Sequence, residues 1–168
     1  MKNRQYLFLG FLFIILCSNI LAQDFTVPRR YSFRRLEDFR RYESDILRCI
    51  EYLEQAPVND LSDNRRRINS FLLEWLTDVP YVQVRINSAV MDLCRENTNF
   101  LIIFMGGWVK YSLSHSDDNE IVNGYLAGIE SILRVYQRGN GVIEDSRIEG
   151  LIVIQRNGKL RDWVLEQL

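Results

Sequence analysis

The residues that could carry chemistry in this 168-residue chain are few and scattered. Its single histidine, His115, lies in a polar stretch with Asp117 and Asp118. A metal site needs several histidine, cysteine or carboxylate ligands that converge, and this stretch supplies one histidine. A catalytic triad through Ser114 or Ser116 is disfavoured as well, because neighbours in a loop rarely hold a nucleophile against its base. We therefore expect neither a metal site nor a triad here.

Paired carboxylates are the remaining route to catalysis. The sequence contains no nucleophile-elbow, zinc-protease, phosphate-loop or dinucleotide-binding motif. Glutamates on separate helices could still meet in space and act as acid and base. The candidates are Glu51, Glu74, Glu130 and Glu149. Because acidic residues on helices are usually solvated, we expect no catalytic residue and no cofactor. A hydrolase with a carboxylate site is kept as a further alternative.

Two cysteines, Cys49 and Cys94, lie within the region expected to form the folded domain. In an oxidising compartment they could form a disulfide, and the loop it closes predicts a stabilisation of about 4 kcal/mol. The alternative is two separate buried thiols that pack as small apolar side chains. Neither cysteine belongs to a C-x-x-C motif, so the sequence gives no support for thiol redox catalysis.

The first 22 residues have the three regions of a secretory signal peptide. Lys2 and Arg4 make a basic start, an apolar stretch runs from Leu7 to Cys17, and a short segment ends at Ala22. The apolar stretch is shorter than the roughly 20 residues that a membrane-spanning helix needs. We therefore predict cleavage before Gln23 and a protein that is exported, either to the periplasm or to the medium.

Charge and length describe the remaining chain as one modest domain. The whole sequence has 21 Lys and Arg against 22 Asp and Glu, a net charge of −1. Removal of the leader makes the chain slightly more acidic, which argues against nucleic acid or an anionic membrane as partner. Residues 23–31, with Pro28, are expected to form an extended lead-in. Residues 32–168 are expected to form a single soluble, monomeric domain without a membrane span.

Apolar side chains recur at intervals of three and four through this domain, which predicts an all-α fold. The pattern indicates a long first helix from Ser32 to just before Pro57, and a second that Pro80 stops. Residues 81–86 alternate like a strand but have no partner strand, so they are interpreted as a connector. A very apolar helix over 100–113 and a helix over 120–138 are expected at the centre, followed by two short helices before the C-terminus. We predict a compact bundle of five or six helices.

The two central helices form a predicted hairpin with an unusual glycine content. With the turn near residues 116–117, the glycines of one helix face those of the other. Each glycine weakens a helix by about 1 kcal/mol relative to alanine, so a compensating role is expected. One explanation is close packing of the helix backbones; the other is a small apolar pocket with a glycine floor and an aromatic rim. The candidate ligand-binding residues are Gly106, Gly107, Trp108, Tyr111, Tyr125 and Gly128.

Four segments resemble a family of small secreted all-helical proteins from Bacteroidota-type bacteria that has no named activity. They are EWLTDVP at 74–80, FMGGWVKYSL at 104–113, NGYLAGIESILRVYQ at 123–137 and NGKLRDWV at 157–164. The resemblance spans most of the chain after the leader. It implies the helical fold and export, and it supplies no site residue.

These observations favour a non-catalytic interaction or accessory module whose partner is a protein of the cell envelope. An exposed aromatic patch or groove would serve as its binding surface. The first alternative is a carrier of a small apolar ligand in the glycine-floored pocket.

Overall fold

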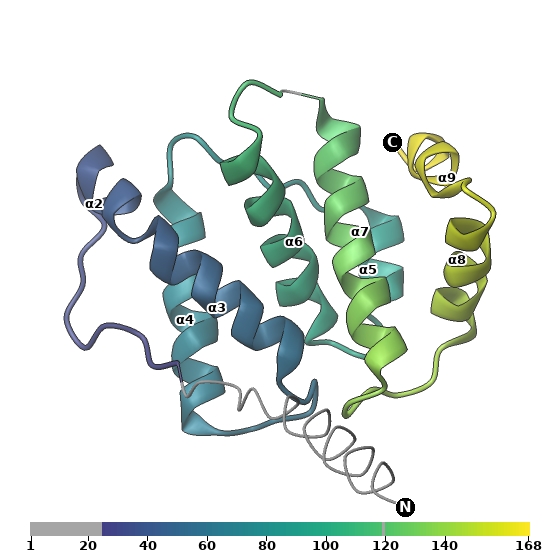
Figure 1. The fold of residues 1–168 in the computed structure, drawn as a ribbon, viewed down its shortest axis with the longest axis horizontal. Helices are drawn as coiled ribbons and strands as arrows, with labels where there is room; N and C mark the ends of the chain where they lie inside the picture. The colour runs from purple at the N-terminus through teal and green to yellow at the C-terminus, as the bar shows by residue number, and fades with distance from the viewer. Residues whose placement is uncertain (1–24, 119) are drawn as a thin grey trace, which may run out of the picture.

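The computed structural model describes residues 25–118 and 120–168, and in these ranges the chain folds into eight α-helices without a strand (Figure 1). The all-α prediction is confirmed, although short helices raise the number above the expected five or six. The predicted signal peptide, with its cleavage site, lies outside the described residues. The helices are α2 (Leu36–Arg41), α3 (Glu43–Gln55), α4 (Asp63–Asp78), α5 (Ser88–Leu93), α6 (Phe100–Ser114), α7 (Ile121–Arg138), α8 (Ser146–Arg156) and α9 (Leu160–Glu166).

The first helix starts later than its apolar pattern predicts. It begins at Leu36 rather than after Ser32. The Asp38 carboxylate accepts hydrogen bonds from the backbone N–H groups of Arg34 at 3.3 Å and Arg35 at 3.1 Å. A carboxylate at this position satisfies N–H groups that a helix start leaves without partners. It therefore fixes the start of the helix at Leu36, with Arg35 as the N-cap residue.

The long first helix of the prediction is also interrupted, at Tyr42, into α2 and α3. The indole Nε1–H of Trp75 donates to the carbonyl of Phe39 at 3.1 Å. In a continuous helix that carbonyl would accept from the N–H of Glu43, four residues on. The indole N–H of Trp75 on α4 therefore replaces the N–H of Glu43 as donor to this carbonyl, and the helix is interrupted at Tyr42.

The lead-in packs on the helices. Its described residues, from Phe25 onward, form no helix or strand, as expected for an extended segment. Phe25 is 7% exposed, its ring lies 4.8 Å from the guanidinium carbon of Arg48, and its carbonyl accepts from the side chain of Asn64 at 3.0 Å. Tyr31 packs edge-on against Phe71 of α4, with ring centroids 4.7 Å apart. This segment therefore belongs to the domain.

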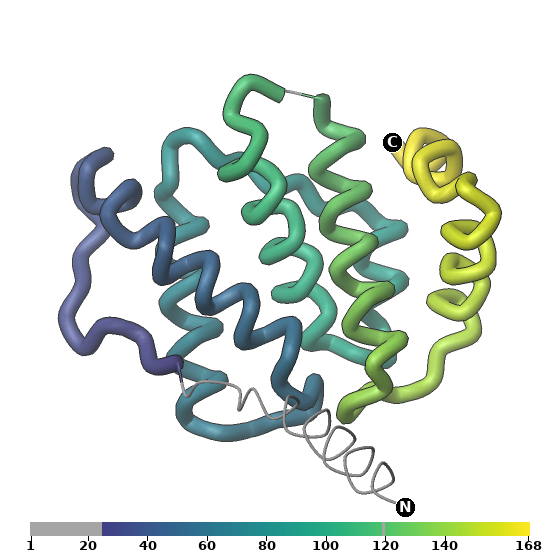
Figure 2. Tube along the Cα trace, in the orientation of Figure 1, coloured from purple at the N-terminus to yellow at the C-terminus, as the bar shows by residue number. Residues whose placement is uncertain are grey.

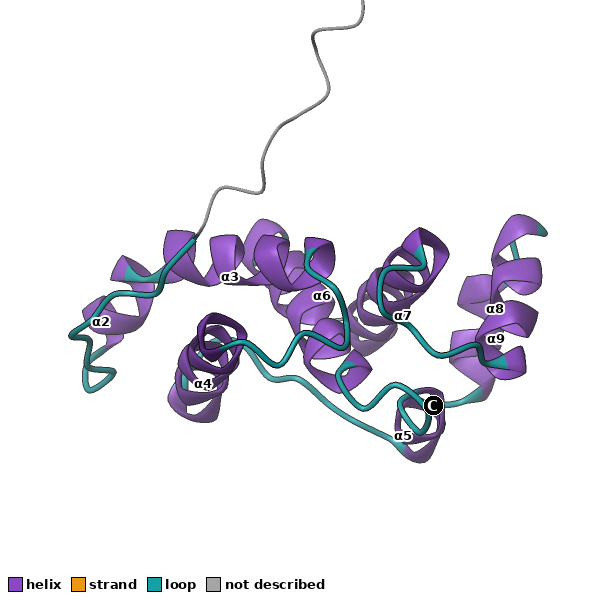
Figure 3. Cartoon of the chain, turned by 90° about the horizontal axis from the view of Figure 1, so that it is seen from below, coloured by secondary structure: helices purple, strands orange, loops and turns teal. Residues whose placement is uncertain are grey.

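The α6–α7 hairpin forms the centre of the bundle. α6 packs against α3, α5 and α7, and α7 packs against α8 and α9. In the tube of Figure 2 and the view from below in Figure 3, this pair lies between α3 and α4 on one side and α8 and α9 on the other. Phe100, Phe104 and Val109 of α6 are fully buried. The expectation that this apolar helix is central is confirmed.

A buried carboxylate joins three helices inside this core. Glu54 of α3 is 8% exposed, and one of its carboxylate oxygens accepts from the Ser131 hydroxyl at 2.9 Å and from Arg134 at 3.2 Å. Its other oxygen lies 3.4 Å from Nζ of Lys110 on α6. Buried charges persist only where partners of this kind surround them. Glu54 thus ties α3 to both helices of the hairpin.

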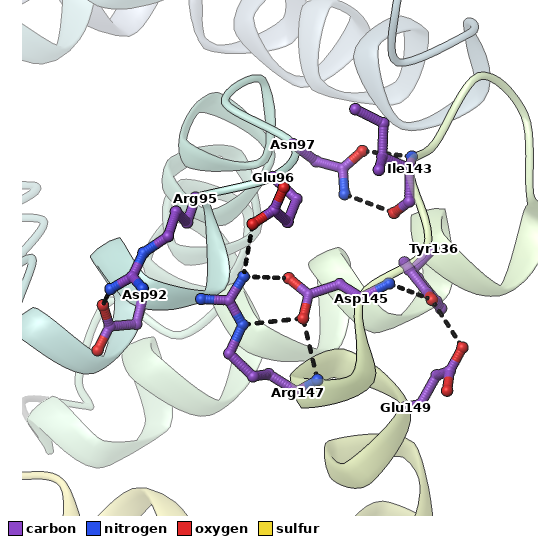
Figure 4. Close-up of polar contacts among 9 residues, drawn as sticks. All are labelled: Asp92, Arg95, Glu96, Asn97, Tyr136, Ile143, Asp145, Arg147 and Glu149. Atoms are coloured by element: carbon purple, nitrogen blue, oxygen red, sulfur yellow. Dashed lines mark hydrogen bonds and ion pairs between the residues drawn. The ribbon is translucent and has the colours of Figure 1, made fainter.

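Two loops that are far apart in the sequence meet at what we call the loop junction (Asn97, Ile143, Asp145 and Arg147; Figure 4). The Asn97 side chain donates to the Ile143 carbonyl at 2.8 Å and accepts from the Ile143 N–H at 2.7 Å. Asp145 caps α8 by accepting from the Arg147 N–H at 2.9 Å, and it binds the Arg147 guanidinium through both oxygens, at 2.9 and 2.7 Å. Arg147 also lies 3.5 Å from Glu96. The junction therefore anchors the start of α8 to the loop before α6.

None of the described helices is both long and apolar enough to cross a lipid bilayer.

Candidate binding cleft

The structure places the glycines of α7 in tight contact with aromatic rings of α6. A Cβ added at Gly128 would lie 2.5 Å from Cδ2 of Phe104 and 2.8 Å from the Phe104 carbonyl oxygen. A Cβ at Gly124 would overlap the indole ring of Trp108. Both distances are far below ordinary van der Waals contact, so these positions accept only glycine without a shift of the helices.

The glycines of α6 face two different neighbours. A Cβ at Gly107 would lie 2.6 Å from the Ala127 carbonyl oxygen of α7, and one at Gly106 would lie 3.1 Å from Cγ2 of Ile50 on α3. Tyr125, 4% exposed, packs against Trp108 with ring centroids 4.9 Å apart. Packed side chains and backbone thus occupy the space over Gly106, Gly107 and Gly128, as in the close-packing explanation, whereas Gly124 also borders a cleft.

A cleft of about 580 Å³ opens beside this packed region, at the end of the bundle that carries the α6–α7 turn. Two of the six candidate residues, Trp108 and Tyr111, line it. Gly106, Gly107, Tyr125 and Gly128 do not. The cleft has three walls: the α6–α7 turn with the ends of its helices, the α2–α3 junction with Arg40 and Glu43, and the connector between α4 and α5.

Hydrogen bonds to one carboxylate hold the α6–α7 turn. Asp118 accepts from the hydroxyl of Tyr111, from the side chain of Asn123 at 2.6 Å and from the N–H of Glu120 at 2.8 Å. These bonds, that of Tyr111 first, hold the pKa of Asp118 below its ordinary value, and the same contact raises the pKa of Tyr111. The imidazole of His115 stacks on the Tyr111 ring with centroids 4.2 Å apart. Asp118 therefore links α6 and α7 at this wall of the cleft.

The serine and histidine of this turn are in contact without forming a triad. Nδ1 of His115 lies 2.9 Å from Oγ of Ser114 and 3.2 Å from the Tyr111 carbonyl. The same Oγ lies 2.9 Å from the Lys110 carbonyl, so its single proton has competing acceptors within α6. Among the described residues no carboxylate hydrogen-bonds to the imidazole, and no group of three or more His, Cys, Asp or Glu side chains is arranged to hold a metal ion.

The opposite wall is held by a tyrosine that the sequence did not single out. The hydroxyl of Tyr81 donates to the Glu43 carboxylate at 2.8 Å, and its ring packs edge-on against Trp75 at 6.2 Å. Burial and the Glu43 carboxylate raise the pKa of Tyr81. The contact ties the connector to the start of α3. Tyr81 remains 38% exposed and lines the cleft.

The four glutamates considered as hydrolase candidates lie on four different helices. Three of them, Glu51 on α3, Glu74 on α4 and Glu149 on α8, are solvent-exposed. Glu149 accepts from the hydroxyl of Tyr136 at 3.2 Å. Glu130, on α7, is half-buried. None of the four lines the cleft.

Both domain cysteines are buried, free thiols in the structure. Cys49 lies on α3, and Cys94 directly follows α5. Each of these two helices packs against α6. The disulfide considered from the sequence is therefore not present, and the arrangement is that of two separately buried thiols. Burial raises the pKa of Cys49 to about 12 and that of Cys94 to about 11.

We expect these two thiols to be unreactive in the folded protein, because only the thiolate is nucleophilic. Iodoacetamide at pH 8 should leave Cys49 and Cys94 unmodified under native conditions and alkylate both in urea without a reductant. Peptide mass spectrometry checks each site. Alkylation that required a prior reduction step would show a disulfide instead.

Comparisons with known proteins found no relative: no family model, curated protein or solved structure matches the chain. The resemblance to secreted Bacteroidota-type proteins stays a prediction.

Proposed function

We propose that this protein is an exported, non-catalytic interaction module that binds a protein partner of the cell envelope in the cleft at the α6–α7 turn. The observation that carries the proposal is the cleft of about 580 Å³, because three segments distant in the sequence converge to line it. Export is supported by the basic, apolar and polar regions of residues 1–22.

The side chains of the cleft are of the types that protein interfaces favour. Tyr81, Trp108 and Tyr111 contribute aromatic surface, and Arg40 and Arg85 contribute guanidinium groups. Aromatic residues and arginine are enriched at the cores of protein interfaces and dominate their binding energy. Hydrogen bonds within the domain hold Tyr81 and Tyr111 in place, and Trp108 is packed against Tyr125, so little side-chain freedom is lost on binding.

Site-specific photo-crosslinking in the native host tests the proposal. A benzophenone amino acid in place of Gln83, which is exposed and lines the cleft, should give a discrete adduct with one partner. That adduct should be found in the periplasmic or secreted fraction, with an N-terminus at Gln23. The matched control carries the same amino acid in place of Val153, which is 55% exposed on α8.

Equal adducts from both positions, or none from position 83, would contradict binding in the cleft. Adducts confined to the cytoplasm, on a chain that still begins at Met1, would contradict export.

A further inference from the structure

A second recess lies between the lead-in and α4, and it shares no lining residue with the cleft. Its volume is about 680 Å³. Four residues of the lead-in between positions 27 and 31 form one wall, and four residues of α4 between positions 63 and 70 form the other. We call this recess the lead-in groove. The contacts of Phe25 with Asn64 and of Tyr31 with Phe71 hold the lead-in beside α4.

The charged side chains that line the lead-in groove are three arginines and one aspartate. Asp63 pairs with Arg66. Arg29 and Arg67 are exposed, and neither forms an ion pair within the described part of the chain. The lining of the groove therefore has an excess of two positive charges, three minus one. The lining of the cleft differs, because its two arginines lie beside three carboxylates.

One further carboxylate lies near the lead-in groove without lining it. Burial, and after it the carboxylate of Glu74, raise the pKa of Tyr31. When Glu74 is counted, three arginines still exceed two carboxylates. The uncharged lining includes the exposed Ser70 and the half-buried Val27 and Pro28. The lead-in groove thus offers cationic and hydroxyl donors next to apolar surface.

We propose that the lead-in groove binds a soluble organic phosphomonoester, with its phosphate against Arg29 and Arg67 and its organic group against Val27 and Pro28. A phosphomonoester carries a charge of about −1.5 to −2 at pH 7, which matches the excess charge of the lining. The forked donors of guanidinium groups fit phosphate oxygens, and the Ser70 hydroxyl can donate to a third oxygen. This site is separate from the cleft and does not depend on the proposed function.

The near-neutral charge of the whole chain does not oppose a small anion in this groove. Salt screens exposed charges beyond a Debye length of about 8 to 10 Å, so a small ligand responds mainly to the side chains that surround it. Whole-chain charge is the better guide for a long polyanion, which spans many such distances.

Titration of the protein with phenyl phosphate at pH 8 and low ionic strength tests the proposal. The backbone amide resonances of Arg29 and Arg67 should shift and saturate. Arg29→Gln and Arg67→Gln should each weaken binding about tenfold. The matched control is Arg156→Gln, which removes the same charge from an exposed position on α8 outside the lead-in groove and should leave the affinity unchanged. Urea denaturation verifies that all three variants fold.

Asp63→Asn should change the affinity in the opposite direction. It removes the carboxylate that lines the lead-in groove and releases Arg66 from its ion pair. Affinity for phenyl phosphate should therefore rise about threefold. Such a gain cannot result from a loss of folding, and a decrease in affinity would contradict the proposal.

Two further probes separate a phosphomonoester from other anions. Benzoate has the same ring with a single charge and should bind about tenfold more weakly, and phosphatidylglycerol vesicles should not sediment the protein. Equal affinity for benzoate would overturn the phosphate chemistry, and sedimentation with vesicles without any shift by phenyl phosphate would overturn a soluble ligand. Unchanged affinity in both groove variants, or an equal loss with Arg156→Gln, would overturn the site. These results leave the cleft untouched, where crosslinking from position 83 decides the proposed function.

Discussion

Gly128→Leu is expected to destabilise the protein by about 3 kcal/mol. The new side chain would start 2.5 Å from the Phe104 ring and 2.8 Å from the Phe104 carbonyl, so the helices of the central hairpin would have to move apart. Chemical denaturation in urea measures the loss as a lower transition midpoint.

Gly150→Leu is the matched control, because a Cβ at Gly150 on α8 meets nothing within 4 Å. It should be neutral or slightly stabilising, since glycine is the weaker helix former. If Gly128→Leu kept the wild-type midpoint, space would have to exist over α7, and the ligand-carrier alternative would regain support.

Asp145→Ala is expected to cause a loss of about 2 kcal/mol, because it removes a helix cap and breaks an ion pair whose carboxylate is buried. The Asp145 side chain is 1% exposed and binds Arg147 through both oxygens. Asp145→Asn should cause a smaller loss, because an amide oxygen can still accept from the N–H of Arg147. Thermal and urea unfolding at neutral pH measure both variants.

The contribution of Asp145 should also depend on pH. Arg147, through its hydrogen bonds, holds the pKa of Asp145 below its ordinary value. A carboxyl whose pKa is lowered by folding stabilises the native state above its unfolded pKa of about 3.9, and that stabilisation is lost as the pH falls through the folded pKa. The stability difference between wild type and Asp145→Asn should therefore shrink below about pH 4. A difference that stayed constant from pH 7 to pH 3 would show that the charge of Asp145 does not matter.

Helix ends that carry a capping side chain, a glycine or a proline could be predicted from the sequence. Ser62 and Asn87 cap α4 and α5 through their side chains, Gly139 ends α7 in the left-handed conformation, and Pro80 follows the end of α4. Each signal acts within one helical turn, so the sequence alone contains it. The central position of α6 was also predictable, because a helix that is apolar on all sides must be buried on all sides.

Features that depend on distant contacts were not predictable. The break at Tyr42 requires the indole of Trp75, which lies more than thirty residues away in the sequence. The burial of Glu54 requires Ser131 and Arg134 of α7. A helical periodicity describes one face of a helix and does not say which side chain of another helix will reach it.

Some residues of the cleft could also be predicted from the sequence, and others could not. Trp108 and Tyr111 were candidates because of their place beside the hairpin glycines, and both line the cleft. Arg40, Glu43 and Tyr81 were missed, since nothing in the sequence places the α2–α3 junction opposite the α6–α7 turn. The alternation of residues 81–86 was the one local signal, and the connector that it marks forms a wall of the cleft.

The burial of Phe25 constrains when the proposed removal of the leader could take place. This ring lies only three residues beyond Ala22, the expected cleavage position, and it is covered by the folded domain. A protease acts on exposed, extended backbone. If the leader is removed as proposed, the peptidase must act while the segment around Phe25 is still unfolded, before Phe25 packs against Arg48 of α3 and its carbonyl accepts from Asn64 of α4.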